Sequence, residues 1–308
     1  MSQLPFIDAD LLRSLVPMPA AMTALERAFG AADDGGPARS HLAVPAGDLL
    51  IMPAHGPAGV GVKLVTVAPG NPARGLPLIH GLYVLFAADT MAPAALIDGA
   101  ALTALRTAAV SGLAARYLAR SDATRLVVFG AGTQARAHVA ALRAVRPLVR
   151  VTIVSRTAAS AATLVGDLRA DGVDASVGTP AAVRTADLVC TCTTSITPVV
   201  DGDLLPDGVH VTAVGAYKPD ARELDATTMR RGRVVVERRD AALAEAGDLL
   251  LAIAEGAMTR DDIAADLAEV VAGVAVRRSD ADVTVFKSVG LALEDLAVAA
   301  AAVVRLGA

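Results

Sequence analysis

Two basic residues interrupt apolar segments of this 308-residue chain, where a charge is expensive to bury. Lys63 lies inside the run GVGVKLVTV, and Arg106 lies inside LTALRTAAV. A lysine in a strand is either a surface residue or a buried functional amine, and the apolar flanks of Lys63 favour the second. An arginine among small apolar residues forms a structural ion pair, for instance with Asp98, or binds a substrate carboxylate. Composition leaves both alternatives for Arg106 open.

A glycine turn in the middle of the chain is typical of a dinucleotide site. The apolar run 126–129 leads into GAGTQA, which comprises Gly130, Ala131, Gly132, Thr133, Gln134 and Ala135. Gly130 permits a tight turn, Gly132 lets the backbone approach phosphates, and Ala135 lets helix and strand pack closely. About 120 residues precede the turn, so another domain is built before the nucleotide domain.

The next predicted strand ends in Ser155-Arg156-Thr157, where NAD-binding proteins usually place an acidic residue for the ribose hydroxyls. A guanidinium with two hydroxyls suits a 2′-phosphate instead, because arginine binds phosphate as a bidentate ion pair. The sequence therefore favours NADP, with NAD as the alternative if Arg156 is only a solvated turn residue.

Other chemically capable residues allow simpler interpretations. Asp225 follows a predicted strand and is either a proton relay or the cap of the helix that begins next. Cys190 and Cys192 lack a CxxC spacing and a nearby histidine, so we expect core packing and no metal site. His138 is expected to be structural.

Composition excludes several classes of protein. Net charge is −4 without a basic tract, which argues against a nucleic-acid partner. No apolar run approaches the roughly 18–20 residues that span a membrane, and the start MSQLPFIDAD lacks the regions of a signal peptide. With two cysteines that we interpret as reduced thiols, we expect a cytoplasmic protein with a small-molecule site. Since 54% of residues are hydrophobic and 3% aromatic, the core must consist of alanine, valine and leucine.

Hydrophobic patterns predict two kinds of architecture. The first 30 residues are predicted helical, 33–37 a loop, 42–98 a largely antiparallel sheet and 102–119 a long helix. From residue 124, strands alternate with helices, which predicts a parallel sheet with helices on both faces. Its strands are expected at 125–129, 149–154, 173–177, 187–193, 209–214, 233–237 and 283–287, before a last helix at 291–304.

The chain resembles the ornithine cyclodeaminase/mu-crystallin family over nearly its full length. The segments that carry the resemblance are GVKLVTVAPGNPARGLP, LIDGAALTALRTAAVSGLAARYLA, VVFGAGTQARAH, TTSITPVV, AVGAYKPDARELD, EAGDL and TVFKSVGLALEDLA. The resemblance implies a Rossmann dinucleotide-binding domain (116–291) inserted into a discontinuous α+β substrate-binding and dimerisation domain (1–115 and 292–308). It further implies a homodimer and a nicotinamide cofactor acting at the α-carbon of amino or imino acids.

The resemblance also assigns roles to residues. Lys63 and Arg106 would bind the substrate carboxylate and act as catalytic residues, with Lys63 also assisting proton transfer. Arg39 is a looser match for another carboxylate-binding arginine, and Asp225 would be the acid/base. The implied cofactor-binding residues are Thr107, the 130–135 turn, Ser155, Arg156, Thr157, Thr193, Lys287, Ser288 and Gly290.

One departure from the family pattern bears on the substrate. Ornithine cyclodeaminase has a glutamate for the distal amine where this chain has Leu50, and Thr227 occupies the place of its catalytic acid. A buried ammonium without a carboxylate partner is costly, so a substrate with a distal amine is disfavoured. The leading hypothesis is therefore an NADP-dependent enzyme that reduces imines or ketimines, or carries out reductive amination. Its product would be an L-amino or cyclic imino acid. Cyclodeamination of ornithine or lysine with tightly bound NAD is the alternative. A non-catalytic, mu-crystallin-like binding protein is the third hypothesis.

Overall fold

The computed structural model describes residues 4–31 and 36–307, so residues 33–35 of the predicted loop lie outside the described residues. The chain divides into two compact units, one formed by 1–109 with 291–308 and the other by 110–290. The sequence prediction put the boundaries at 115/116 and 291/292. Helix α3 (Gly99–Leu118) contains the first boundary.

The first unit is built on a sheet with the order β1-β6-β5-β4-β3-β2. Strands β2 (Ser40–Val44), β3 (Gly47–Gly56), β4 (Gly59–Val67), β5 (Ile79–Phe86) and β6 (Pro93–Asp98) pair antiparallel. The prediction of one helical segment at the N-terminus is wrong in detail. β1 (Phe6–Ile7) pairs parallel to β6, and Pro17 separates α1 (Ala9–Leu15) from α2 (Met18–Gly30).

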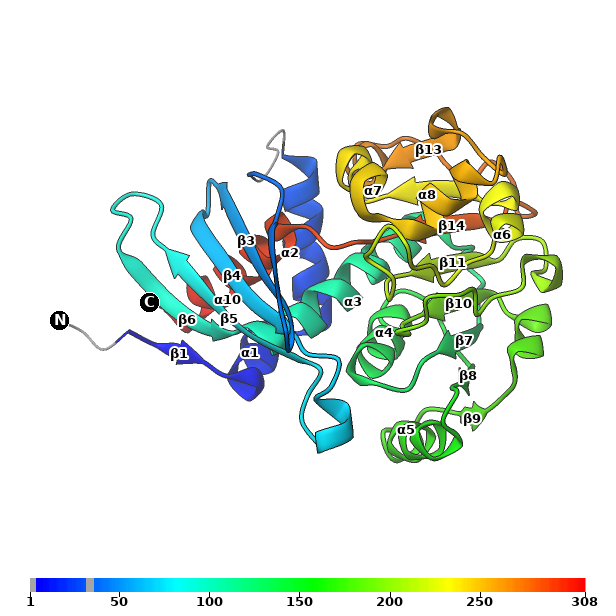
Figure 1. The fold of residues 1–308 in the computed structure, drawn as a ribbon, viewed down its shortest axis with the longest axis horizontal. Helices are drawn as coiled ribbons and strands as arrows, with labels where there is room; N and C mark the ends of the chain where they lie inside the picture. Colours follow the sequence, from blue (N-terminus) through cyan, green and yellow to red (C-terminus); the bar gives the residue numbers. More distant parts are fainter. Residues whose placement is uncertain (1–3, 32–35, 308) are drawn as a thin grey trace. The chain divides into compact units, whose positions relative to one another are not determined.

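The C-terminal helix α10 (Ala292–Leu306) completes the first unit by packing against α2, β3 and β4. In Figure 1 this red helix lies among the blue and cyan elements from the start of the chain. Its buried residues include Glu294 and Asp295, two acids in an otherwise apolar face. The return of the chain thus places two carboxylates in the core of the first unit.

The second unit is an eight-stranded parallel sheet among the described residues, ordered β13-β12-β14-β11-β10-β7-β8-β9. Its strands are β7 (Arg125–Phe129), β8 (Arg150–Val154), β9 (Ala175–Val177), β10 (Leu188–Thr191), β11 (His210–Ala213), β12 (Arg233–Val236), β13 (Ile263–Asp266) and β14 (Thr284–Lys287). Strand β13 and the short helix α9 (Leu267–Val271) were not predicted, because four or five residues carry too little periodicity.

Helices α4 (Thr133–Arg143), α5 (Ala158–Ala170), α6 (Ala226–Arg231), α7 (Arg239–Glu245) and α8 (Gly247–Ala254) connect these strands. Two apolar clusters, rich in valine, leucine and alanine, form the core. The strand order reverses at β7, since β8 and β9 follow on one side and β10 and β11 on the other. In open parallel sheets, ligands bind at the carboxyl ends of strands beside such a reversal.

Among the residues that the structure describes, no helix is long and apolar enough to cross a membrane.

Candidate active site

Lys63 lies on the buried face of strand β4. Its side chain is 1% exposed, whereas the next residue, Leu64, is 38% exposed on the opposite face. Its cross-strand neighbours are Met52 of β3 and Tyr83 of β5, and both are buried. The alternative of a surface lysine is therefore wrong.

A carboxylate from the C-terminal helix accompanies the Lys63 ammonium. Lys63 Nζ lies 2.7 Å from Asp295 Oδ2 and 2.9 Å from Oδ1. Burial lowers the pKa of Lys63 to about 8; the Asp295 carboxylate opposes this shift, and the charges of Arg106 and Arg39 reinforce it. An amine with this pKa exchanges its proton close to neutral pH, as acid/base chemistry requires.

Arg106, in helix α3, belongs to the same cluster. It is 5% exposed, its Nη1 lies 2.7 Å from Glu294 Oε2, and its Nε lies 3.2 Å from Asp295 Oδ1. Asp98, the partner suggested from sequence, instead accepts hydrogen bonds from the backbone N–H groups of Ala100 and Ala101. We call Lys63, Arg106, Glu294 and Asp295 the Lys63 cluster.

Arg39 lies between α2 and β2, is partly buried, and is close enough to Lys63 to affect its pKa. The structure thus brings three predicted carboxylate-binding residues, Arg39, Lys63 and Arg106, into one electrostatic neighbourhood in the first unit. Thr107 follows Arg106 in α3 and is also buried.

Sequence reasoning missed Glu294, Asp295 and Tyr83. The two acids form the ED pair in LALEDLA, and acids within an apolar helix were the available signal. Tyr83 is fully buried, and its hydroxyl has no hydrogen-bond partner within the described parts of the chain. Gly61 leaves room for it, because a Cβ there would lie 1.9 Å from the Tyr83 oxygen. Burial, and then the charge of Asp295, raise the pKa of Tyr83.

The surface beside Lys63 is apolar. Leu50 and Met52 are two residues apart on β3, so both lie on its buried face. Met52 is directly opposite Lys63 in the sheet register. Leu50 is 6% exposed and stands where ornithine cyclodeaminase was expected to have a glutamate. At this position the chain therefore offers no carboxylate to a distal amine.

In the second unit, the glycine turn joins β7 to α4. Gly130 has φ +113°, and a Cβ there would lie 2.6 Å from the Cys192 carbonyl oxygen, so only glycine fits without strain. Gly132 is the N-cap of α4, has no side-chain cap bond, and would leave an added Cβ in open space. The first N–H groups of an 11-residue helix are thus available to an anion, which fits a pyrophosphate.

Ser155, Arg156 and Thr157 follow β8, the strand next to β7. Ser155 Oγ accepts a hydrogen bond from the Thr157 N–H at 3.3 Å, which shapes the turn. Arg156 is exposed. Thr193 follows β10, on the other side of β7, so three predicted cofactor-binding segments collect at adjacent strand ends.

A buried carboxylate holds Thr193 in place. Glu223 accepts hydrogen bonds from the Thr193 N–H and hydroxyl at 2.6 and 2.7 Å, from the Thr191 hydroxyl at 2.9 Å and from the Gly215 N–H at 2.7 Å. Burial raises the pKa of Glu223, while the charge of Lys287 and these hydrogen bonds oppose the rise. Glu223, which sequence reasoning overlooked, is an organising residue of the strand ends.

Buried acidic side chains also hold the FKSVG segment (residues 286–290) in place. Lys287 Nζ lies 2.8 Å from Asp248 Oδ2 and donates to the Ala216 carbonyl at 2.5 Å. Glu237 accepts hydrogen bonds from the Ser288 hydroxyl and from the N–H groups of Val289 and Gly290 at 2.5–3.0 Å. These contacts give Lys287 and Ser288 structural partners, and their contact with a cofactor stays a prediction.

Asp225 is the N-cap of α6. Its Oδ1 accepts from the Thr228 N–H at 2.7 Å, and its Oδ2 accepts from the Gly202 N–H at 3.0 Å. The capping interpretation accounts for both oxygens, and a proton-transfer role for Asp225 stays a prediction.

Comparison with known proteins agrees with this geometry. Residues 10–305 match the model of the ornithine cyclodeaminase/mu-crystallin family. A Delta(1)-pyrroline-2-carboxylate reductase of Bacillus cereus is 40% identical over 262 residues, which cover 81% of this chain and 79% of the relative.

Two solved structures are similar over almost the whole chain. The Thermococcus litoralis Delta(1)-pyrroline-2-carboxylate reductase in complex with NADH and L-proline has a TM-score of 0.94 at 33% identity, covering 98% of this chain and 97% of that one. An archaeal alanine dehydrogenase dimer with bound NAD has a TM-score of 0.92 at 34% identity, covering 98% and 95%.

Proposed function

Since the chain belongs to the ornithine cyclodeaminase/mu-crystallin family, we propose that it is a nicotinamide-dependent reductase of a C=N bond adjacent to a carboxylate. The hydride is added to C2, and the product is an L-amino or cyclic imino acid. One observation carries the proposal: Lys63 and Arg106 are buried together beside the apolar residues Leu50 and Met52. Similar proteins named for pyrroline-2-carboxylate reduction support a cyclic imine as substrate.

The Lys63 cluster binds and orients the carboxylate in this proposal. Arg106 and Arg39 each carry a guanidinium, whose geometry matches that of a carboxylate. Glu294 and Asp295 hold the cations in position before substrate arrives and compensate part of their charge. Much of the rate acceleration then comes from positioning and preorganised charge.

Reduction of the imine also requires a proton at nitrogen. We assign its delivery to Lys63, because its pKa of about 8 leaves it charged yet able to release a proton near neutral pH. Asp225, the acid/base expected from the resemblance, already accepts two backbone hydrogen bonds.

The second unit holds the cofactor, whose reduced nicotinamide supplies the hydride when bound. The 130–135 turn and the N-terminus of α4 bind its phosphates. Arg156 with Ser155 and Thr157 favours a 2′-phosphate, so we propose NADP over NAD. The similar structures named above contain NADH or NAD, which makes the ratio of the two affinities a direct test. An Arg156→Ala variant should lose affinity for NADPH about tenfold or more and keep its affinity for NADH.

A homodimer is proposed from the outer face of the first sheet. Leu42 of β2 is 55% exposed and Leu64 of β4 is 38% exposed, and the register places both on the face opposite Lys63. A second copy would bury this apolar surface. Light scattering should give twice the chain mass for the wild type and a lower mass for Leu42→Glu.

The activity test measures oxidation of NADPH and NADH with pyrroline-2-carboxylate, piperideine-2-carboxylate and pyruvate plus ammonia. Turnover of one of these, lost in Lys63→Met, is the expected result. Ammonia release from ornithine or lysine without net cofactor oxidation would establish cyclodeamination instead. Folded protein that binds cofactor and a carboxylate but turns over nothing would overturn the proposal in favour of a binding protein.

A further inference from the structure

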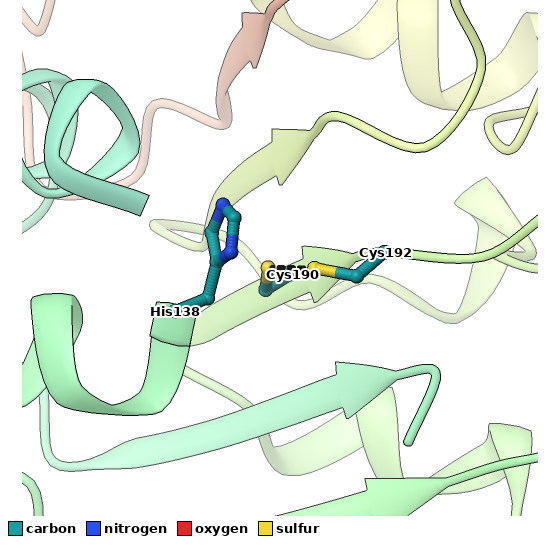
Figure 2. Close-up of side chains that lie close together, drawn as sticks. All are labelled: His138, Cys190 and Cys192. Carbon is teal, nitrogen blue, oxygen red and sulfur yellow. Dashed lines mark hydrogen bonds between the residues drawn. The ribbon is translucent and has the colours of Figure 1, made fainter. Parts of the chain in front are cut away.

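Three side chains of the kinds that bind transition-metal ions lie close together in the core of the second unit. His138 of α4, Cys190 of β10 and Cys192, just beyond β10, each offer a ligand atom, and these atoms lie within 4.8 Å of one another (Figure 2). His138 and Cys190 are fully buried, and Cys192 is partly buried. The expectation that no histidine complements the cysteine pair is therefore wrong, because the fold brings α4 over β10.

The hydrogen bonds of His138 determine which nitrogen is available. Its Nδ1 lies 2.8 Å from the Gln134 carbonyl oxygen, which can only accept, so Nδ1 carries the proton in the neutral ring. Nε2 then carries the lone pair and accepts a hydrogen bond from the Ser111 hydroxyl at 3.0 Å, a bond that a metal ion on Nε2 would replace. Histidines that bind metals commonly donate Nδ1–H to a backbone carbonyl in this way, which fixes the tautomer and the ring orientation.

We propose that His138, Cys190 and Cys192 form a binding site for a thiophilic metal ion of the Zn²⁺ or Cu⁺ type, with Nε2 and the two sulfurs as ligands. Thiolate and imidazole are the ligands that such ions prefer. Binding of the ion replaces the two thiol protons, which leave to solvent, so no oxidant or reductant is involved. Zn²⁺ would take the Ser111 hydroxyl or water as a fourth ligand.

Sulfur spacing favours a metal over a disulfide. The two Sγ atoms are 3.3 Å apart. Two thiolates on one zinc, each at about 2.3 Å in a tetrahedron, are roughly 3.8 Å apart, so the sulfurs need to separate only slightly. A disulfide would require them to approach to about 2.05 Å.

Metal binding would act on the glycine turn. The Cys192 N–H donates to the Phe129 carbonyl at 2.8 Å, and the Cys192 carbonyl is the atom that excludes a side chain at Gly130. His138 lies on the helix that the same turn begins. The ion would join both sides of the turn, so we expect metal binding to change the affinity for a dinucleotide. Only this consequence rests on the proposed function.

The test uses reduced, chelator-treated full-length protein. Zn²⁺ is titrated against a colorimetric chelator, Cu⁺ against bicinchoninate without oxygen, and Co²⁺ is followed by its thiolate charge-transfer absorption. One ion per chain should bind, with release of about two protons. The two competition titrations show which ion is preferred.

Variants separate the site from adventitious binding. Cys190→Ala with Cys192→Ala should abolish the cobalt absorption and lower affinity about 100-fold, and His138→Gln should lower it about tenfold. His210→Gln is the matched control, because this buried histidine hydrogen-bonds Thr284 and is not in the cluster. Circular dichroism verifies folding. Equal metal binding by wild type and the double cysteine variant, or full affinity in His138→Gln, would overturn the site, whatever the activity assay shows.

Discussion

Titration of Lys63 should control binding of carboxylates to the first unit. The pKa of Lys63 is lowered to about 8 by burial, so the free protein loses this charge between pH 7 and pH 10. If the ammonium must be charged to bind an anion, affinity falls tenfold per pH unit above the pKa. From pH 7 to pH 10 this amounts to about 100-fold, or ~3 kcal/mol.

Pyrrole-2-carboxylate is a suitable probe, because it is planar like an imine substrate and its carboxylate stays ionised throughout this range. Its dissociation constant would be measured by calorimetry at half-unit pH steps. Lys63→Met is the control, since methionine fills similar space without a charge and should make the affinity weak and independent of pH. A flat profile in the wild type, or an unchanged slope in Lys63→Met, would refute the reasoning.

The pH dependence of stability reports on the same pKa shift of Lys63 independently of ligand binding. The folded-state pKa of Lys63, about 8, lies below the ordinary value of 10.5, so the unfolded chain binds more protons between these values. The penalty of burying the charge is therefore present below pH 8 and is relieved as the pH rises. The free energy of unfolding of wild type relative to Lys63→Met should rise by ~3 kcal/mol across this window, in the opposite direction to carboxylate affinity.

Three further predictions use other contacts. Tyr83→Phe removes a buried hydroxyl without a partner in the described chain and should raise the free energy of unfolding by ~1 kcal/mol in urea; a decrease would mean that the hydroxyl is satisfied. Gly130→Ala should cost ~1–3 kcal/mol because of its positive φ and the Cys192 carbonyl, whereas Gly132→Ala should keep the melting temperature and weaken cofactor binding; equal effects on melting would contradict the assigned geometry. Asp225→Asn should lower stability by ~1 kcal/mol and leave the turnover number nearly unchanged; a large loss of turnover would make Asp225 the acid.

Local sequence signals predicted the elements that carry their own pattern. The glycine turn, the strands from β7 to β12 and the helix that contains Arg106 are visible because turn chemistry and periodicity act over a few residues. The sequence also identified Lys63 as buried, because both of its flanks are apolar. The match to the family and the α/β fold with a parallel sheet are confirmed.

Partners across long sequence separations were not predictable in the same way. Asp295 reaches Lys63 across 232 positions, and that contact depends on how α10 returns to β4. Likewise, His138 meets the two cysteines only because α4 packs over the sheet that contains β10. No propensity specifies such contacts, since they follow from the register of strands and the packing of helices.

The ion pairs of the Lys63 cluster have a consequence for specificity. Breaking a buried pair costs several kcal/mol, so Lys63 and Arg106 need Glu294 and Asp295 in the absence of ligand. An incoming substrate carboxylate must therefore compete with Glu294 and Asp295 for these cations. Its net electrostatic gain on binding is smaller than it would be if the cations were unpaired. Discrimination among substrates then depends more on the apolar neighbours, Leu50 and Met52, which impose a desolvation cost on any second ammonium. If the proposed function is right, the cluster would select for a carboxylate, while Leu50 and Met52 would select for a substrate whose neighbouring atoms are apolar.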